Sequence, residues 1–266
     1  MGIPRTVILG AGNVATHLAT ALNDHVDLRG VWSRSDDNAK TLAGKRGCPV
    51  LSSPAEVPAD TDLVIISVVD DAVARLAAQL KPVRGIVCHT SGSVPMSVLT
   101  DAGHRLAGVF YPMQTFSKHR EVDMLQVPFF IEGSDKDTAR ILHSIAGSIS
   151  ASVHYADSDV RARLHLGAVF ACNFANELWR IAADTVRPVG CGLDIYRSLI
   201  RETLDKAIEM GPENARTGPA KRHDLDVMRY QAASLDGAEK NIYGIISELI
   251  SGIPAEKITT HESAEQ

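Results

Sequence analysis

The chain has 266 residues, of which 45% are hydrophobic and 22% are charged, and it carries a formal net charge of −5. This length is enough for two domains of ordinary size with a substantial core. The sequence has no basic block of the kind that binds nucleic acid, no apolar run near the ~20 residues of a membrane span, no leader-like N-terminus, and only four scattered cysteines without metal-ligand spacing. We therefore expect a cytoplasmic protein with no nucleic-acid partner, no membrane partner and no metal site.

The first predicted strand, residues 6–9, leads directly into the sequence GAGNVA at residues 10–15. Gly10 permits a tight turn, and Gly12 removes the side chain that would block a pyrophosphate. The helix that follows presents free N–H groups to an anion at its N-terminus. An ordinary turn is the alternative, but the strand-turn-helix context predicts a dinucleotide site formed by Gly10, Gly12, Asn13 and Val14.

The second predicted strand, residues 26–32, indicates which dinucleotide binds. Sites that prefer NAD place a carboxylate at the tip of this strand, where it accepts the ribose 2′-hydroxyl. Here the tip is Ser33-Arg34-Ser35, a guanidinium between two hydroxyls, which suits a 2′-phosphate. The sequence thus favours NADP(H), with Arg34 as a solvated loop cation being the alternative.

The rest of the first half alternates between strands and helices. Helices are predicted at 37–46 and 72–80, and strands at 49–51, 63–68, 85–88, 105–110, 129–131 and 152–155. The apolar run at 63–68 is typical of a strand that is buried on both faces. This pattern predicts an α/β domain over residues 1–156, a Rossmann-type doubly wound and mostly parallel sheet.

Polar residues follow several of these strands, where open α/β sheets bind their ligands. Val69 and the two aspartates after it would lie along the nicotinamide ribose, although an aspartate there more often caps the next helix. His89 and Ser91 could contact the nicotinamide or a polar substrate group, unless these residues simply form a hydroxyl-rich turn. The segment YPMQTF at 111–116 is either a rigid wall over a ring or an ordinary loop.

The second half, residues 157–266, reads as an all-helical domain, with helices at 159–186, from 195 to about 210, at 221–233 and at 235–250. His165 and Asn173 lie near one face of the first helix, as a substrate site or as a structural polar cluster. Arg222 lies at a predicted helix start, where a cation opposes the helix dipole, so it could bind an anionic substrate, bind the NADP phosphates or pair with surface acids.

The last predicted helix has more apolar positions than a small bundle obviously needs. A homodimer through the helical domain is one reading, and an internal core is the other. The positions concerned are Ile242, Tyr243, Ile245, Ile246, Leu249 and Ile250.

The glycine fingerprint, together with HTSGS at 89–93, YPMQTFS at 111–117 and TGPAKRHD at 217–224, resembles a bacterial family of NADP-dependent oxidoreductases. The resemblance spans almost the whole chain and implies a Rossmann-like domain followed by a helical domain of unknown function. The chain is similar, more distantly, to pyrroline-5-carboxylate reductase, ketopantoate reductase and the β-hydroxyacid dehydrogenases. The last of these use a helix lysine as proton donor, and the segment 166–173 retains an asparagine but has no lysine.

These observations predict an NADPH-dependent reductase of a small polar imine or carbonyl compound, with the nicotinamide in a cleft between the domains. His89 or His165 would donate the proton, and Asn173 and Arg222 would orient the substrate, which could be anionic. The alternative is a non-catalytic NADP(H)-binding sensor or regulator. A nucleotide-methyl-donor enzyme is a weaker third reading, because Arg34 replaces the acidic residue that such sites also favour.

Overall fold

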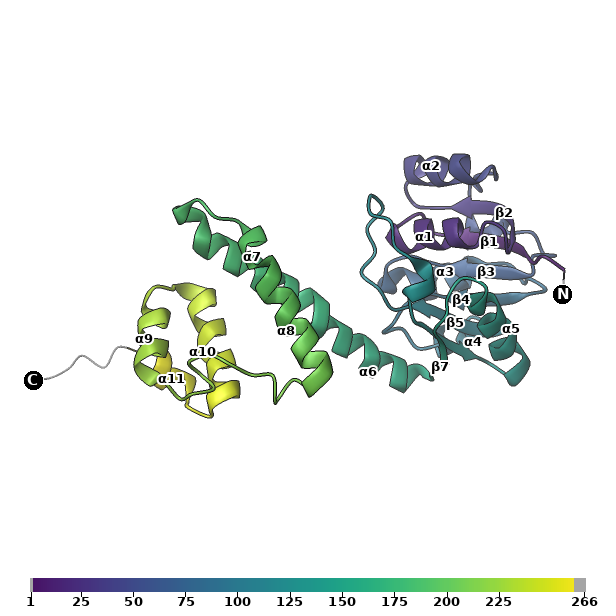
Figure 1. Ribbon diagram of the computed structural model, residues 1–266. Coiled ribbons are helices and arrows are strands. Elements are labelled where there is room, and N and C mark those ends of the chain that lie inside the picture. Colours follow the sequence, from purple (N-terminus) through teal and green to yellow (C-terminus); the bar gives the residue numbers. More distant parts are fainter. Residues whose placement is uncertain (1, 261–266) are drawn as a thin grey trace, which may run out of the picture. The chain divides into compact units, whose positions relative to one another are not determined.

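Seven strands form one sheet in the order β2-β1-β3-β4-β5-β6-β7 in the computed structural model, which describes residues 2–260 (Figure 1). Neighbouring strands are parallel, except that β6 runs antiparallel to β5. The predicted mostly parallel α/β sheet is confirmed. Its strands are β1 Arg5–Leu9, β2 Asp27–Trp32, β3 Leu63–Ile66, β4 Ile86–His89, β5 Ala107–Pro112, β6 Phe129–Gly133 and β7 Val153–Tyr155.

Helices cover both faces of this sheet. On one face, α1 (Asn13–Ala21), α2 (Asp36–Arg46) and α5 (Lys136–Gly147) bury residues such as Leu18, Leu42 and Leu142 against the strands. On the other face, α3 (Asp70–Gln79) and α4 (Ser97–Asp101) do the same. All four residues of β3 are buried, as expected for a β-branched, apolar strand between two layers of helices.

The direction of the chain across the sheet reverses at β1, which lies between β2 and β3. In open α/β sheets a ligand binds at such a switch point, beyond the carboxyl ends of the strands. The loops after β1, β2 and β3 therefore meet where a dinucleotide would bind.

The strand predicted at 49–51 does not form, and that prediction was wrong. Only one residue pair, Val31 and Val50, bridges there, although Val31 N donates to Pro49 O and Leu51 N donates to Val31 O. Pro49 has no N–H to donate, so this segment cannot extend a ladder beside β2.

The chain divides into two compact units, one that runs to Asn173 and one that begins at Phe174. The first unit extends past residue 156, where the sequence alone puts the boundary, because it includes α6 (Ser158–Ala168). Arg161 of α6 is completely buried and pairs with Glu132 of β6, which ties the helix to the sheet. A π-helical segment, Val169–Phe174, then replaces the middle of the helix predicted at 159–186.

The second unit consists of helices, namely α7 Ala175–Val186, α8 Arg197–Met210, α9 Leu225–Ala233, α10 Gly237–Ser251 and α11 Ala255–Thr259. A small core forms around Met228, Ala232 and Ile258. The helix predicted at 221–233 begins only at Leu225, because Asp224 caps it and His223 adopts a positive φ of 57°. Among the described helices, none is long and apolar enough to cross a membrane.

Candidate functional site

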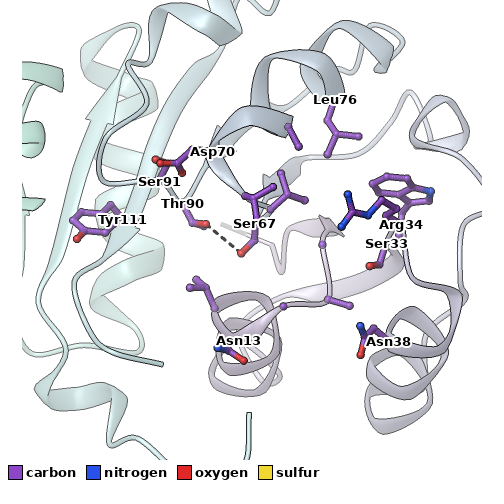
Figure 2. Close-up of a pocket in the computed structure, with 18 of the residues that line it drawn as sticks. Asn13, Ser33, Arg34, Asn38, Ser67, Asp70, Leu76, Thr90, Ser91 and Tyr111 are labelled. Atoms are coloured by element: carbon purple, nitrogen blue, oxygen red, sulfur yellow. Dashed lines mark hydrogen bonds between the residues drawn. The ribbon is translucent and has the colours of Figure 1, made fainter. Parts of the chain in front are cut away.

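A cavity of about 890 Å³ lies at the carboxyl ends of the strands in the first unit. Residues that follow β1, β2, β3, β4 and β5 line it, together with His165 of α6. Figure 2 shows the two ends: Arg34, Ser33 and Asn38 lie at one, and Tyr111, Ser91 and Asp70 at the other. The cavity is thus lined both by residues predicted to bind the 2′-phosphate and by residues predicted to bind the nicotinamide.

The glycine turn has the geometry that a pyrophosphate requires. Gly10 has a φ of 133°, and a Cβ there would lie 1.9 Å from Ser67 O, so no other residue fits. Gly12 precedes α1, whose N-terminus has neither a side-chain cap nor an acidic residue in its first turn. A Cβ on Gly12 would meet no atom within 4 Å. The space in front of free helix N–H groups is therefore open, and an anion fits it.

Asn13 and Val14 also line the cavity, at the first turn of α1. The side-chain amide of Asn13 donates to Phe116 O at 3.0 Å, and a ring nitrogen of His17 contacts Ser117 O at 2.9 Å. These bonds hold the loop after β5 against α1. The Asn13 side chain is thus engaged with the protein, which leaves its backbone N–H as the group for a phosphate.

Ser33, Arg34 and Ser35 line the opposite end of the cavity, as the sequence predicts for a 2′-phosphate. Ser33 Oγ accepts a bond from Ser35 N at 3.3 Å, and Ser35 caps α2 by accepting from Asn38 N at 3.4 Å. The Arg34 side chain is exposed. Arg75 of α3 lines the same cavity and was missed in the sequence, because nothing there indicates which face of α3 it occupies.

The loop after β3 does not behave as the sequence suggests. Val69, not Asp70, occupies the N-cap position of α3, and no side chain caps this helix. The expectation that an aspartate caps α3 was wrong, because the carboxylate of Asp70 instead accepts a hydrogen bond from Ser93 Oγ. Val69 is strongly exposed in the cavity, where a ligand ring would cover it.

The loop after β4 is a turn built from hydroxyl groups that also lines the cavity. Ser91 Oγ accepts from Ser93 N at 3.1 Å and from Val94 N at 3.0 Å, while Thr90 Oγ1 donates to Ser67 Oγ at 3.1 Å (Figure 2). The hydroxyl-rich turn raised as the alternative for this segment therefore forms. The hydroxyls stabilise a turn, and that turn presents Thr90, Ser91 and Gly92 to the cavity.

His89 lies at the end of β4 but is completely buried and is not among the residues that line the cavity. Its Nδ1 accepts a hydrogen bond from Ser91 N at 3.2 Å. Burial, followed by the nearby charge of Arg161, lowers the pKa of His89 to about 4. The structure therefore gives His89 the role of a neutral acceptor that shapes the turn.

His165 and Tyr111 meet at the wall of the cavity. The hydroxyl of Tyr111 and Nδ1 of His165 are 3.0 Å apart, and the two rings pack edge to face. A Cβ on Gly92 would lie 2.6 Å from His165 Nδ1 and 2.8 Å from Tyr111 Cζ. Glycine is thus required for both rings to lie against this turn. Tyr111 is a candidate that the sequence reasoning treated only as part of a wall.

Asn173 and Arg222 are not among the residues that line this cavity. Asn173 is exposed in the π-helical segment, and π-helical turns are often found at functional sites. Arg222 is exposed in the second unit, in the turns that precede α9. The cavity therefore brings together every predicted cofactor residue and His165, but not His89, Asn173 or Arg222.

Two family models match parts of the chain. Residues 4–81 match the model of an oxidoreductase family with an NAD-binding Rossmann fold, and residues 127–250 match a domain of unknown function, DUF2520. A search of curated proteins finds no match.

Several solved structures share the fold. A reductive aminase from Aspergillus terreus, in complex with NADPH and ethyl-5-oxohexanoate, is 17% identical, with a TM-score of 0.62, over 96% of this chain and 90% of its own. A pyrroline-5-carboxylate reductase from Coxiella burnetii is 12% identical, with a TM-score of 0.59, over 98% of this chain and all of its own.

A structure from Bacteroides fragilis, described as a "putative NADP oxidoreductase", is much more similar. It is 39% identical, covers 94% of this chain and 99% of its own length, and has a TM-score of 0.88. The chain thus has an oxidoreductase-type NAD(P)-binding fold, and it belongs to the same family as the Bacteroides fragilis protein.

Proposed function

We propose that this protein is an NADPH-dependent reductase of a small polar imine or carbonyl compound. The observation that carries this proposal is the single cavity, which runs from the cation and hydroxyls after β2, past the open glycine turn, to the polar groups after β4 and β5. This order of groups matches the order of the parts of a dinucleotide, from 2′-phosphate through pyrophosphate to nicotinamide.

The preference for NADPH rests on charge. The model of the oxidoreductase family is described as NAD-binding and the Bacteroides fragilis protein as an NADP oxidoreductase, so membership alone does not select the cofactor. Arg34 and Arg75 both line the cavity, and Asp70 is the only carboxylate among the described residues that do so. Because Asp70 bonds Ser93 of the loop after β4, it is near the opposite end from Arg34. Two guanidinium groups without an opposing carboxylate favour a 2′-phosphate over a 2′-hydroxyl.

The class of substrate follows from the groups at the far end. NADPH would supply the hydride that reduces the carbon of a C=N or C=O bond. Ser91, Tyr111 and His165 offer hydrogen bonds to a polar compound there, and segment 166–173 supplies no lysine as proton donor. Asn173 and Arg222 remain candidates to orient an anionic substrate.

The test of this function is NADPH oxidation by the full chain, followed with a panel of cyclic imines, ketones and 2-keto acids. The proposal predicts turnover of at least one class, and a Michaelis constant that rises when Ser91 is replaced by Ala. Tight NADPH binding without turnover of any compound would contradict the reductase and favour the sensor instead.

We also propose that the protein is a homodimer through its second unit. Helices α7 and α8 bury no residue in the described chain, and several of their large apolar side chains are exposed, with Ile208 74% exposed. Exposed apolar faces of this kind mark protein interfaces. A second copy of the chain is the partner proposed, because an isologous contact would cover the same faces on both copies.

A further inference from the structure

Tyr111 and His165 share a hydrogen bond, although they are 54 positions apart in the sequence. Tyr111 comes from the end of β5, and His165 lies on α6, one helical turn after the buried Arg161. The ion pair between Arg161 and Glu132 holds this part of α6 against the sheet. Gly92 lies directly against both rings. Three separate segments of the fold thus fix the position of one tyrosine hydroxyl.

The two members of the pair differ in their access to water. Tyr111 is only 7% exposed, whereas His165 is partly exposed. Burial raises the pKa of the Tyr111 phenol, which the neighbouring Asp70 and Cys172 raise further and Arg161 lowers. The phenol therefore keeps its proton at neutral pH, while the ring of His165 is in contact with water.

Few other groups on the cavity wall could supply a proton. Among the described residues that line it, the ionisable ones are Arg34, Arg75, Asp70, Tyr111 and His165. Guanidinium groups do not release protons at neutral pH. Asp70 already accepts the hydrogen bond of Ser93, as a carboxylate does. The Tyr111 and His165 pair remains.

We propose that Tyr111 donates the proton to the substrate nitrogen or oxygen, and that His165 positions the Tyr111 hydroxyl and restores its proton. This inference rests on the proposed reductase function and names the acid that the function needs. As the substrate carbon is reduced, the π electrons of the C=N or C=O bond become a lone pair on nitrogen or oxygen. That atom takes the proton of Tyr111 as the phenolic O–H bond breaks. The tyrosinate then takes the proton from His165 Nδ1, and His165 takes one from water at Nε2, which leaves hydroxide for the buffer to neutralise. Exchange with water then moves the imidazole proton from Nε2 back to Nδ1 and restores the starting tautomer. Over the cycle, one hydride and one proton are consumed and Tyr111 is regenerated.

The decisive experiment compares substrates that do and do not need this proton. A ketone, or a cyclic imine above its own pKa, must gain a proton on oxygen or nitrogen, but an N-methylated cyclic iminium ion needs none. Tyr111→Phe should lower kcat on the first kind by about 100-fold or more, the usual effect of losing a general acid. It should leave kcat on the iminium ion near the wild-type value. Equal losses on both kinds, or no loss on either, would overturn the proposal.

The chain offers a matched control in Tyr155, whose ring stacks on His143 with centroids 4.8 Å apart but which does not line the cavity. Tyr155→Phe should leave both substrate kinds unaffected. If the wild type turns over no compound, the reductase function itself has failed. If the wild type turns over both kinds and Tyr111→Phe changes kcat equally on both, only the assignment of the proton donor has failed.

A second readout requires no turnover. Tyr111→Phe should bind NADPH with the wild-type Kd, because its hydroxyl serves the substrate. NMR of the apoprotein with tyrosine labelled at Cζ should show the Tyr111 signal moving when His165 is replaced by Leu, because the hydrogen bond to the phenol is lost. His165→Asn should keep more activity than His165→Leu, because an amide can still bond the phenol. A Tyr111 signal that is the same in His165→Leu as in the wild type would contradict the role of His165.

Discussion

Gly12→Ala should separate cofactor binding from folding. Gly12 has φ −80° and ψ −167°, which alanine adopts freely, and a Cβ there would meet no protein atom within 4 Å. The free energy of unfolding should therefore change by no more than about 0.5 kcal/mol. The same methyl group would enter the space in front of α1, which is the proposed site of the pyrophosphate. Forcing a methyl group into a packed contact costs about 1–3 kcal/mol, which corresponds to a roughly 5- to 150-fold weaker Kd for NADPH.

The assay pairs calorimetric titration of NADPH with urea unfolding of the same variant. Gly44→Ala is the matched control, because a Cβ there also meets nothing within 4 Å but Gly44 lies in α2 and does not line the cavity. Gly10→Ala is the opposite case. Its Cβ would collide with Ser67 O, and its φ is unfavourable for alanine, so it should cost roughly 3 kcal/mol or more of stability. Unchanged NADPH affinity in a stable Gly12→Ala protein would refute the reasoning about the glycine turn.

Three further predictions concern stability and assembly. His89 stays neutral in the folded protein down to pH about 4 but is protonated below about 6.5 when unfolded, so wild-type stability should fall by about 3 kcal/mol more than that of His89→Asn as pH drops through this range. If urea unfolding shows that the stabilities of the two proteins fall equally with pH, the neutral state of folded His89 is contradicted. Arg161→Met should cost about 3–5 kcal/mol by leaving the Glu132 carboxylate without its cation and bonded only by Ser158, and adding Glu132→Gln should recover part of that loss in a double-mutant cycle; simple additivity would contradict the pairing. Leu199→Lys together with Ile208→Lys should convert a dimer to a monomer in analytical ultracentrifugation, and a monomeric wild type would contradict the proposed dimer.

The sequence predicts the fold well because its signals are local and strong. The fully apolar β3 fits few structures other than a buried strand. The glycine turn at 10–15 fits few structures other than a tight strand-to-helix turn. Prediction from the sequence fails where a local pattern favours one structure but contacts with other parts of the chain favour another. Residues 49–51 have strand composition, but Pro49 cannot donate to a ladder. Asp70 follows a strand, where an aspartate commonly caps the next helix, yet its carboxylate accepts a hydrogen bond from Ser93, 23 residues later.

The candidate site divides in the same way. The residues predicted to bind the cofactor follow strands in known positions of the motif, and the structure places Gly12 and Arg34 on the cavity wall, as spacing alone predicts. Burial is not visible in the sequence, and it makes His89 a neutral structural group instead of an exposed acid. Nor does spacing reveal that Tyr111 and His165 share a hydrogen bond, because that contact depends on how α6 packs against the end of β5.

The most direct test of the central claim is the titration of NADPH and NADH against the wild type and Arg34→Ala. The wild type should bind NADPH at least about tenfold more tightly, since hydrogen bonds to a charged group contribute about 1.5–3 kcal/mol. Arg34→Ala should lose most of that preference while its affinity for NADH stays the same. Arg29→Ala removes another exposed cation, which comes from β2 and does not line the cavity, and it should change neither affinity. Equal affinities of the wild type for the two cofactors, or an Arg34→Ala protein that binds NADPH like the wild type, would contradict an NADPH-dependent reductase.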